Sequence, residues 1–290
     1  MEFNSLQIAV ASDAAALAIE PYVPAISYFA KDFSAAPGML GNAVAIPVFE
    51  HGTTKDGTVL TADAWSTDTP LDGVTINLNK DIVKTYALQD TAAAGTSTFL
   101  KNGAEAIAHV LGVEVNKYVF GELTKTKIDT ANGAVLSATT PTAKAGFAGL
   151  FATAQNLSCD PYDCALVLNP ATYSSLLSTM DYNVIGSSEA AKYGVLESVY
   201  GFRAVINSPF LDTTNGIKGL IIPRDCFGVA ARWNKPIIDG YNTSWVATDA
   251  KTSLPCGFRI YEDVRRGAAV MGGDCMLGAK ILQKGIIELV

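Results

Sequence analysis

The sequence predicts an α+β protein in which an extended hairpin and one long helix precede an α/β region and a β-rich C-terminal region. Residues 41–50 and 73–79 alternate apolar with small or polar residues, which is the period of a strand. Residues 97–123 repeat apolar residues at helical spacing. Between residues 143 and 222, helical segments alternate with short apolar runs, and strand patterns then continue to the C-terminus.

Composition limits the function classes. The chain has 290 residues, of which 49% are hydrophobic, enough for one large core or two smaller ones. Only 17% are charged, and the formal net charge is −7. A dedicated nucleic-acid binder usually carries a basic face, so this class is disfavoured, whereas a protein that merely encloses nucleic acid is not.

Cysteine usage and the N-terminus both favour an intracellular protein. The five cysteines are an odd number without a CxxC pair, so we expect reduced, mostly buried thiols rather than a disulfide framework. Glu2 and the lack of an early Lys or Arg do not fit a signal peptide. No window holds the ~18 uninterrupted apolar residues that a membrane span needs.

The first elements are an N-terminal arm and a hairpin. Apolar residues at helical spacing predict a helix over 5–20, and a second short helical turn should hold Ile26, Phe29 and Phe33. This segment has no core of its own to join, so we expect it to lie along a neighbouring subunit. Pro47 cannot donate to a ladder, so the strand GNAVAIPVFE should be an edge strand or half of a two-stranded arm.

The partner of that strand should be residues 73–79, where Val74, Ile76 and Leu78 alternate with polar residues. About twenty residues separate the two strands, and a connection that long is usually functional or mobile. An isolated two-stranded arm is marginally stable, so this one should lean on something outside its own domain.

The long helix and the α/β region follow. Ser97 or Thr98 can cap the helix, which would extend roughly 40 Å. A second helix is expected over 143–157, followed by the continuous apolar strand 164–168, which suits burial on both faces. Asn169 and Pro170 should then begin the next helix.

The stretch LESVYGFRAVINSPFL reads as the tail of a helix, a glycine and the strand 202–206, which Asn207-Ser-Pro ends. A further strand is expected over 219–222. In the β-rich C-terminal region we expect three separate segments, at 257–261, 267–271 and 279–290.

No sequence motif indicates catalysis. His51 lies in the long hairpin loop and His109 on the long helix, and each reads as a packed or surface histidine. Nucleophile elbow, Walker loop, dinucleotide fingerprint and HExxH motif are all missing. The charge clusters Arg224-Asp225 and Asp263 with Arg265-Arg266 are interpreted as ion pairs. We therefore predict no enzyme, no cofactor and no metal site.

The order of these parts resembles the Hong Kong 97 fold of tailed-phage major capsid proteins. VAIPVFE with VTINLNK resembles the extended loop, and STFLKNGAEAIAHVLGVEVNKYVFGEL resembles the spine helix. NPATYSSLLS and YGFRAVINSPFL resemble the axial α/β domain, and GFRIYEDVRRGAAVMGG resembles the peripheral strands. The resemblance implies an N-terminal arm (1–40), an extended loop (41–90), the spine helix with part of the peripheral domain (91–128), an axial domain (129–234) and peripheral strands to the C-terminus (235–290).

The resemblance implies a structural coat protein that assembles into hexamers and pentamers of an icosahedral head around double-stranded DNA, without reading its sequence. It implies a scaffolding protein and a portal protein as partners, with a decoration protein as an optional one. It also implies assembly in the host cytoplasm, a place in the virion, no membrane and no cofactor. The residues expected to matter are Gly41, Pro47 and Gly73 for the hairpin, Phe202 and Ile206 for the axial core, and Arg265 and Arg266 for ion pairs.

One group of this family forms an isopeptide bond between a loop lysine and a peripheral asparagine, assisted by a glutamate. Lys55 lies at the matching place, but no convincing partners stand out, although Asn234 and Asn242 are candidates. The sequence therefore favours no crosslink. Because the chain begins directly with the arm, we expect a separate scaffolding protein rather than a fused scaffolding domain.

Three other interpretations stay open. An encapsulin-like nanocompartment shell would keep the fold and hold enzymes instead of DNA. A β-rich surface protein is suggested by the Thr, Ala and Gly content, but no signal peptide supports it. An unrecognised α/β hydrolase or transferase would need a nucleophile and a base that the sequence does not reveal.

Overall fold

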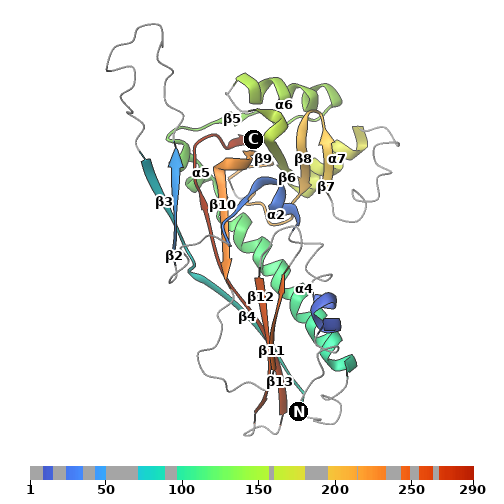
Figure 1. The fold of residues 1–290 in the computed structure, drawn as a ribbon. Helices are drawn as coiled ribbons and strands as arrows, with labels where there is room; N and C mark the ends of the chain where they lie inside the picture. Colours follow the sequence, from blue (N-terminus) through green and yellow to red (C-terminus); the bar gives the residue numbers. More distant parts are fainter. Residues whose placement is uncertain are drawn as a thin grey trace.

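Two six-stranded sheets and a two-stranded hairpin form the architecture of the described residues (Figure 1). The structure is a computed structural model, and it describes residues 9–15, 24–34, 43–49, 71–88, 97–156, 160–179, 195–213, 215–232, 243–248, 255–263 and 268–290. Helices and sheets are both present, and the strands of both sheets pair mostly antiparallel, so the structure agrees with the predicted α+β class.

The first sheet, here called the spine sheet, is organised around one long strand. β13 (Ala268–Ile281) pairs antiparallel with β4 along one edge and with β12 and β10 along the other. β11 extends the sheet beyond β12, and β1 pairs parallel with β10. The other bounds are β1 Lys31–Asp32, β4 Lys80–Leu88, β10 Phe227–Arg232, β11 Thr243–Thr248 and β12 Pro255–Asp263.

The prediction of separate segments at 267–271 and 279–290 is wrong. β13 is one continuous strand that includes Gly272, Gly273 and Gly278. A Cβ added at Gly273 would lie 2.4 Å from Ile107 Cγ2, and one at Gly278 would lie 2.5 Å from the Asn77 carbonyl oxygen. Glycine inside a strand often marks such a close approach. These glycines do not end the strand. Because they have no side chain, they leave room for the long helix and the hairpin.

The second sheet, here called the upper sheet from its place in Figure 1, has the order β5-β14-β9-β6-β8-β7. Its central strand β6 pairs parallel with β8 and antiparallel with β9. The bounds are β5 Ser137–Ala138, β6 Cys164–Leu168, β7 Val195–Val199, β8 Phe202–Asn207, β9 Gly219–Pro223 and β14 Ile287–Leu289. The C-terminal strand β14 therefore belongs to the upper sheet, whereas β10 belongs to the spine sheet.

The segment before Gly201 was expected to be a helix tail, and that expectation is wrong. β7 is a strand that pairs antiparallel with β8, with Val199 opposite Phe202. Tyr200 (φ 50°) and Gly201 (φ 80°) form the two-residue turn between them. Positive φ at both central residues matches the turn that best continues the twist of a hairpin. The periodicity of a short apolar run does not distinguish a helix from a strand. Here the turn at Tyr200 and Gly201 makes the segment a strand of a hairpin.

Both faces of β6 are covered, as the continuous apolar sequence predicted. Leu166 and Leu168 pack with Phe147 and Leu176 from the helices α6 (Lys144–Asn156) and α7 (Pro170–Thr179). Ala165 and Val167 face the opposite side, where they belong to the larger hydrophobic core of the chain, here called the main core. Asn169 Oδ1 accepts a hydrogen bond from the Thr172 backbone N–H at 2.8 Å, which confirms the predicted start of α7.

The N-terminal segment does join a core of its own chain, contrary to expectation. Residues 9–15 are helical, and Ala11 and Ala15 are fully buried in the main core. α2 (Pro24–Phe29) ends on Phe29, whose ring lies 5.5 Å from that of Phe120 and 5.8 Å from that of Phe227. Phe33 lies beyond this helix, after β1. The described part of the arm is thus held by aromatic packing within the same chain.

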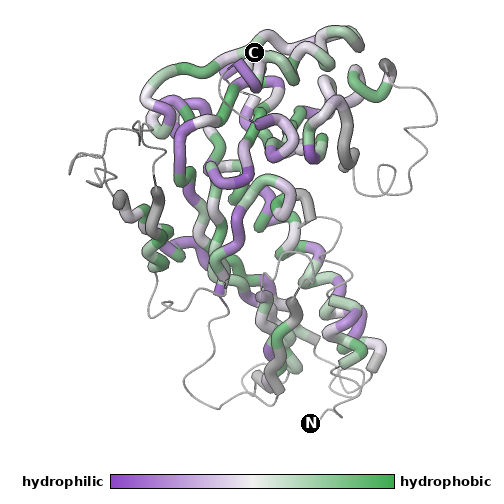
Figure 2. The backbone as a smooth tube through the Cα atoms, turned by 45° about the horizontal axis from the view of Figure 1, so that its top comes forward, coloured by the Kyte–Doolittle hydropathy of each residue, from purple (hydrophilic) through white to green (hydrophobic). Residues whose placement is uncertain are grey.

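The predicted long helix is confirmed as α4 (Ser97–Gly121), whose 25 residues correspond to about 37 Å. Leu100, Ile107 and Leu111 on its buried side pack against the spine sheet. Hydrophilic and apolar residues are interspersed along it (Figure 2). Among the described helices, none is both long enough and apolar enough to cross a membrane.

Candidate assembly surfaces

The base of the hairpin is anchored on the spine sheet. β2 (Ala43–Phe49) pairs antiparallel with β3 (Leu71–Asn77), which confirms the predicted pairing. Val44, Ile46, Ile76 and Leu78 are buried and pack with Ala230 and Leu282. The base of the hairpin therefore leans on the spine sheet of its own chain.

Two of the residues expected to shape the hairpin face each other. Pro47 lies opposite Gly73 in the ladder. In a two-stranded ribbon each strand is an edge strand, so the missing N–H of proline is tolerated there. A Cβ added at Gly73 meets nothing within 4 Å, and its φ lies outside the left-handed region. The structure thus gives no packing requirement for glycine at this position.

A groove of about 530 Å³ runs beside the hairpin base. It lies between β3, the end of α4, α5 (Lys125–Asn132) and the end of β13. Polar groups cross it: the Tyr118 hydroxyl donates to Asn79 Oδ1 at 2.9 Å, and Lys280 Nζ donates to the Thr75 carbonyl at 3.2 Å. These hydrogen bonds join the hairpin to α4 and to β13 and thereby fix the orientation of the hairpin base relative to the spine sheet.

The spine sheet has one covered face and one open face. Alternation along the strands sends Phe258, Met271 and Cys275 toward α4, where they are buried in the main core. The opposite face presents Val83, with 59% of its surface exposed, near Thr85 and Tyr261. These residues border a hollow of about 230 Å³ with Gly272 in its lining. An exposed valine on a glycine-lined hollow suits contact with another surface.

An ion pair sits in the same hollow. Arg259 Nη2 lies 2.7 Å from Asp274 Oδ2, and their side chains are 21% and 7% exposed. Gly257 on β12 lies directly opposite Asp274 on β13, so the carboxylate stands beside a residue without a side chain. Pairing lowers the cost of holding a charge at a mostly buried position. The open face therefore carries an ion pair between two side chains of the same chain.

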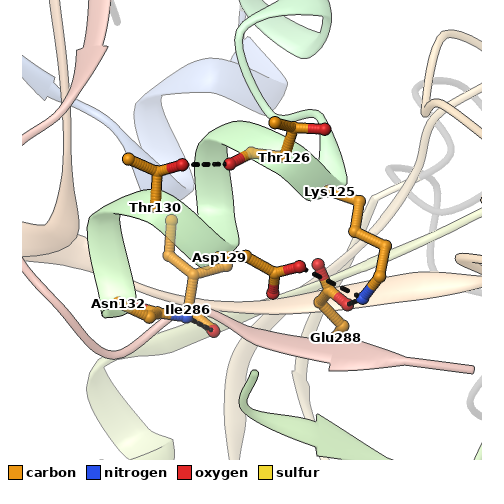
Figure 3. Close-up of polar contacts among 7 residues, drawn as sticks. All are labelled: Lys125, Thr126, Asp129, Thr130, Asn132, Ile286 and Glu288. Carbon is orange, nitrogen blue, oxygen red and sulfur yellow. Dashed lines mark hydrogen bonds and ion pairs between the residues drawn. The ribbon is translucent and has the colours of Figure 1, made fainter. Parts of the chain in front are cut away.

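The junction between the two sheets is held by α5 and the C-terminal strand (Figure 3). Lys125 donates a hydrogen bond to the fully buried Glu288 of β14 and lies 3.5 Å from Asp129 Oδ2. The hydrogen bond to Glu288 is the main reason that the pKa of Lys125 is raised above its usual value. This contact connects the helix that follows the spine to the edge of the upper sheet.

Asn132, at the end of α5, makes a second tie to the C-terminal segment. Its Nδ2 donates to the Ile286 carbonyl at 2.7 Å, and its Oδ1 accepts from the Gly285 N–H at 2.9 Å. Gly133 then ends the helix in the left-handed conformation at φ 69°. Neither Lys125 nor Asn132 was singled out from the sequence, because both partners lie more than 150 residues away and no local signal marks them.

The remaining expected residues are distributed between the core and undescribed segments. Phe202 and Ile206 are 1% and 0% exposed and lie in the core around the upper sheet. Asp225 pairs with Lys31 at 3.3 Å, and His109 is exposed on α4. Outside the described residues lie Gly41, His51, Lys55, Cys159, Asn234, Asn242, Arg265 and Arg266.

The described cysteines are buried free thiols, as expected. Across the part of the chain that the structure describes, no group of three or more His, Cys, Asp or Glu residues is placed to hold a metal ion. The features that stand out are therefore surfaces and ties between segments.

Comparison with known structures identifies the fold. No protein-family model matches this sequence, and no curated protein matches it either. The structure of the capsid of Ralstonia phage GP4 is similar, with a TM-score of 0.57, 11% identity, and coverage of 90% of this chain and 86% of that one. The capsid of an empty GTA particle gives 0.54 and 14%, covering 91% and 88%.

The capsid of the cyanophage P-SCSP1u gives a TM-score of 0.51 at 15% identity, with coverage of 86% of this chain and 83% of that one. At such low identity the likeness concerns the fold. In each of the three cases it spans most of both chains. The chain therefore has the fold of phage major capsid proteins.

Proposed function

We propose that this chain is a major capsid protein that assembles with copies of itself into the icosahedral head of a tailed bacteriophage enclosing double-stranded DNA. The observation that carries the proposal is the agreement in fold with three capsid structures, over 83–88% of their chains. The role is structural, so no reacting group is required.

The distribution of buried and open surface supports the proposal. The spine sheet leaves one face open, with Val83 exposed on it, and the hairpin projects from the body at its base. Identical subunits that cover each other's open faces need no strong single contact, because each subunit has several neighbours. The acidic chain also suits a container for DNA, since a basic wall would bind the genome tightly.

The finer parts of the proposal follow the same fold. The subunits form hexamers and pentamers, a scaffolding protein guides assembly in the host cytoplasm, and a portal protein occupies one vertex. The spine sheet with α4 acts as the peripheral domain, and the upper sheet with α6 and α7 acts as the axial domain. No Lys55 crosslink forms.

The first test is electron microscopy of the particle fraction from cells that express this gene with its genomic neighbours. Icosahedral shells built from this chain with DNA inside are expected. Shells filled with protein would point to a nanocompartment instead. Monomers or small oligomers in the presence of scaffolding protein would contradict the proposal. A band at 30.5 kDa after boiling in SDS would agree with the absence of a crosslink.

A pair of matched variants tests the open face. Val83 and Val135 are 59% and 58% exposed, but only Val83 borders the hollow on the spine sheet. Val83→Lys places a charge on a surface that is buried in the shell, so we expect soluble, folded protein that forms no shells. Val135→Lys is the control and should still assemble. Normal shells from Val83→Lys would show that this face stays outside the contacts between subunits.

A further inference from the structure

Two buried thiols face each other across the spine sheet. The β12–β13 ladder ends with Gly257 opposite Asp274, and Cys256 and Cys275 are the next residue on each strand, so the same register brings them face to face. Both side chains point to the α4 side, and they are 3% and 0% exposed. The two thiols are within hydrogen-bonding distance of each other.

The backbone geometry at this place permits a covalent bond. Directly opposite residues of an antiparallel pair have Cα atoms about 4.5 or 5.5 Å apart. Disulfides span Cα separations of about 4.4–6.8 Å. The two sulfur atoms therefore need side-chain rotation rather than strand movement to approach each other. The other described cysteines differ, because Cys164 and Cys226 donate to backbone carbonyls of Asp160 and Lys284.

We propose that Cys256 and Cys275 are a cross-strand pair that closes to a disulfide when the protein meets a small-molecule disulfide such as oxidised glutathione. The thiolate of Cys256 attacks one sulfur of that disulfide and releases the first small thiol. Cys275 then attacks the Cys256 sulfur of the mixed disulfide and releases the second. Two cysteine thiols are oxidised to one disulfide, and the small disulfide is reduced to two thiols, which take up both protons.

The surroundings determine the order and the speed of these steps. The hydrogen bond to Cys256, burial, and the nearby carboxylates of Asp274 and Asp81 raise the pKa of the Cys275 thiol. Cys275 is therefore the poorer initial nucleophile, and the less buried Cys256 reacts first. Because both thiols are buried between α4 and the spine sheet, the reaction needs a transient opening between this helix and the sheet. The pair should stay reduced in the cytoplasm and close slowly in an oxidising medium.

The disulfide would join β12 to β13 and would close a loop of about twenty residues in the unfolded chain, which restricts the unfolded state. A loop of that size raises the midpoint of thermal unfolding by about 5–10 °C in a chain of this length. The proposal concerns the single chain and does not depend on the shell.

The test uses the purified full chain, incubated with oxidised glutathione at 37 °C and then denatured and alkylated for mass spectrometry. Two of the five cysteines should escape alkylation, and a linked peptide pair should contain Cys256 and Cys275. The thermal midpoint should rise and return to its starting value after reduction. Cys275→Ala and Cys256→Ala should abolish both changes, whereas Cys226→Ala should keep them.

Two results would overturn the proposal. All five thiols could be recovered by alkylation after prolonged incubation. A disulfide could form between other cysteines, such as Cys159 and Cys164, in place of the expected one. If Cys275→Ala does not fold, Cys256→Ala alone decides the linkage, because it removes the first nucleophile.

Discussion

The two sheets of this molecule differ in how many of their faces are buried. The upper sheet is covered on both faces, by α6 and α7 on one side and by the main core on the other. The spine sheet is covered by α4 on one face and leaves the other open, with Val83 exposed. The upper sheet is thus buried on both faces within one chain, whereas the spine sheet leaves one face exposed around Val83. The predictions below test this contrast.

The largest effect is expected in the upper sheet. Phe202→Ala removes a fully buried ring and leaves a cavity in a closed core, so it should lower the free energy of unfolding by ~3–5 kcal/mol. Chemical denaturation measures this loss. Tyr162→Ala is the control, because that ring is 67% exposed and should matter little. A Phe202→Ala variant as stable as the parent would mean that the upper core is not closed.

The next effect should appear where the hairpin meets the spine sheet. A Cβ at Gly278 would lie 2.5 Å from the backbone oxygen of Asn77, so Gly278→Ala must shift the hairpin base. We expect a loss of about 1–3 kcal/mol in the free energy of unfolding. Gly73→Ala is the matched control, because a Cβ there meets nothing within 4 Å. Equal stability of the two variants would contradict the close contact between β13 and β3.

A smaller, pH-dependent effect is expected at the junction between the sheets. Lys125→Met removes the charged partner of the buried Glu288 and should reduce stability at neutral pH. Because the folded-state pKa of Lys125 is raised, its contribution is present below the usual lysine pKa and is lost as pH rises through the raised value. The stability difference between parent and variant should therefore shrink in strong alkali. A difference that stays constant with pH would exclude the ion pair as its cause.

The smallest effect should occur at Tyr173 on α7. Burial raises the pKa of its hydroxyl to about 12, and the hydroxyl has no hydrogen-bond partner among the described residues. The folded state thus resists ionisation, and the stability that this group contributes is lost as pH rises from about 10 to about 12.

Tyr173→Phe should leave neutral-pH stability unchanged or raise it by up to about 1 kcal/mol, because the unpaired hydroxyl is removed. It should also flatten the alkaline decline, as followed by denaturation at several pH values. Tyr162→Phe is the control, because the side chain of Tyr162 is 67% exposed. An unchanged pH profile in Tyr173→Phe would place the origin of the decline elsewhere, with Lys125 as the next candidate.

Local pattern predicted much of the fold. The helical spacing of Leu100, Ile107 and Leu111 and the apolar run of β6 each depend on residues close in the sequence. The pairing of β2 with β3 was also predictable, because both strands alternate and Pro47 limits one of them to an edge. Periodicity carries such information whenever one face of an element is buried.

The surfaces could not be predicted in the same way. The hollow beside Val83 joins β4 to strands nearly two hundred residues away, and the hairpin base rests on β10 and β13. The arm was expected to need a neighbour, because nothing near Phe29 in sequence indicates Phe120 or Phe227 as its partners. Contacts of this kind leave no periodic signal.

By itself, the sequence determined the α+β class, the long helix, the hairpin and the buried central strand of the upper sheet. Each of these follows from a local pattern of apolar residues, either periodic or continuous. Only the tertiary structure decided that β7 is a strand, that β13 continues through its glycines, and that the chain closes on itself through Lys125 and Glu288. These outcomes depend on which distant surface each segment meets, and burial against that surface outweighs weak local preference.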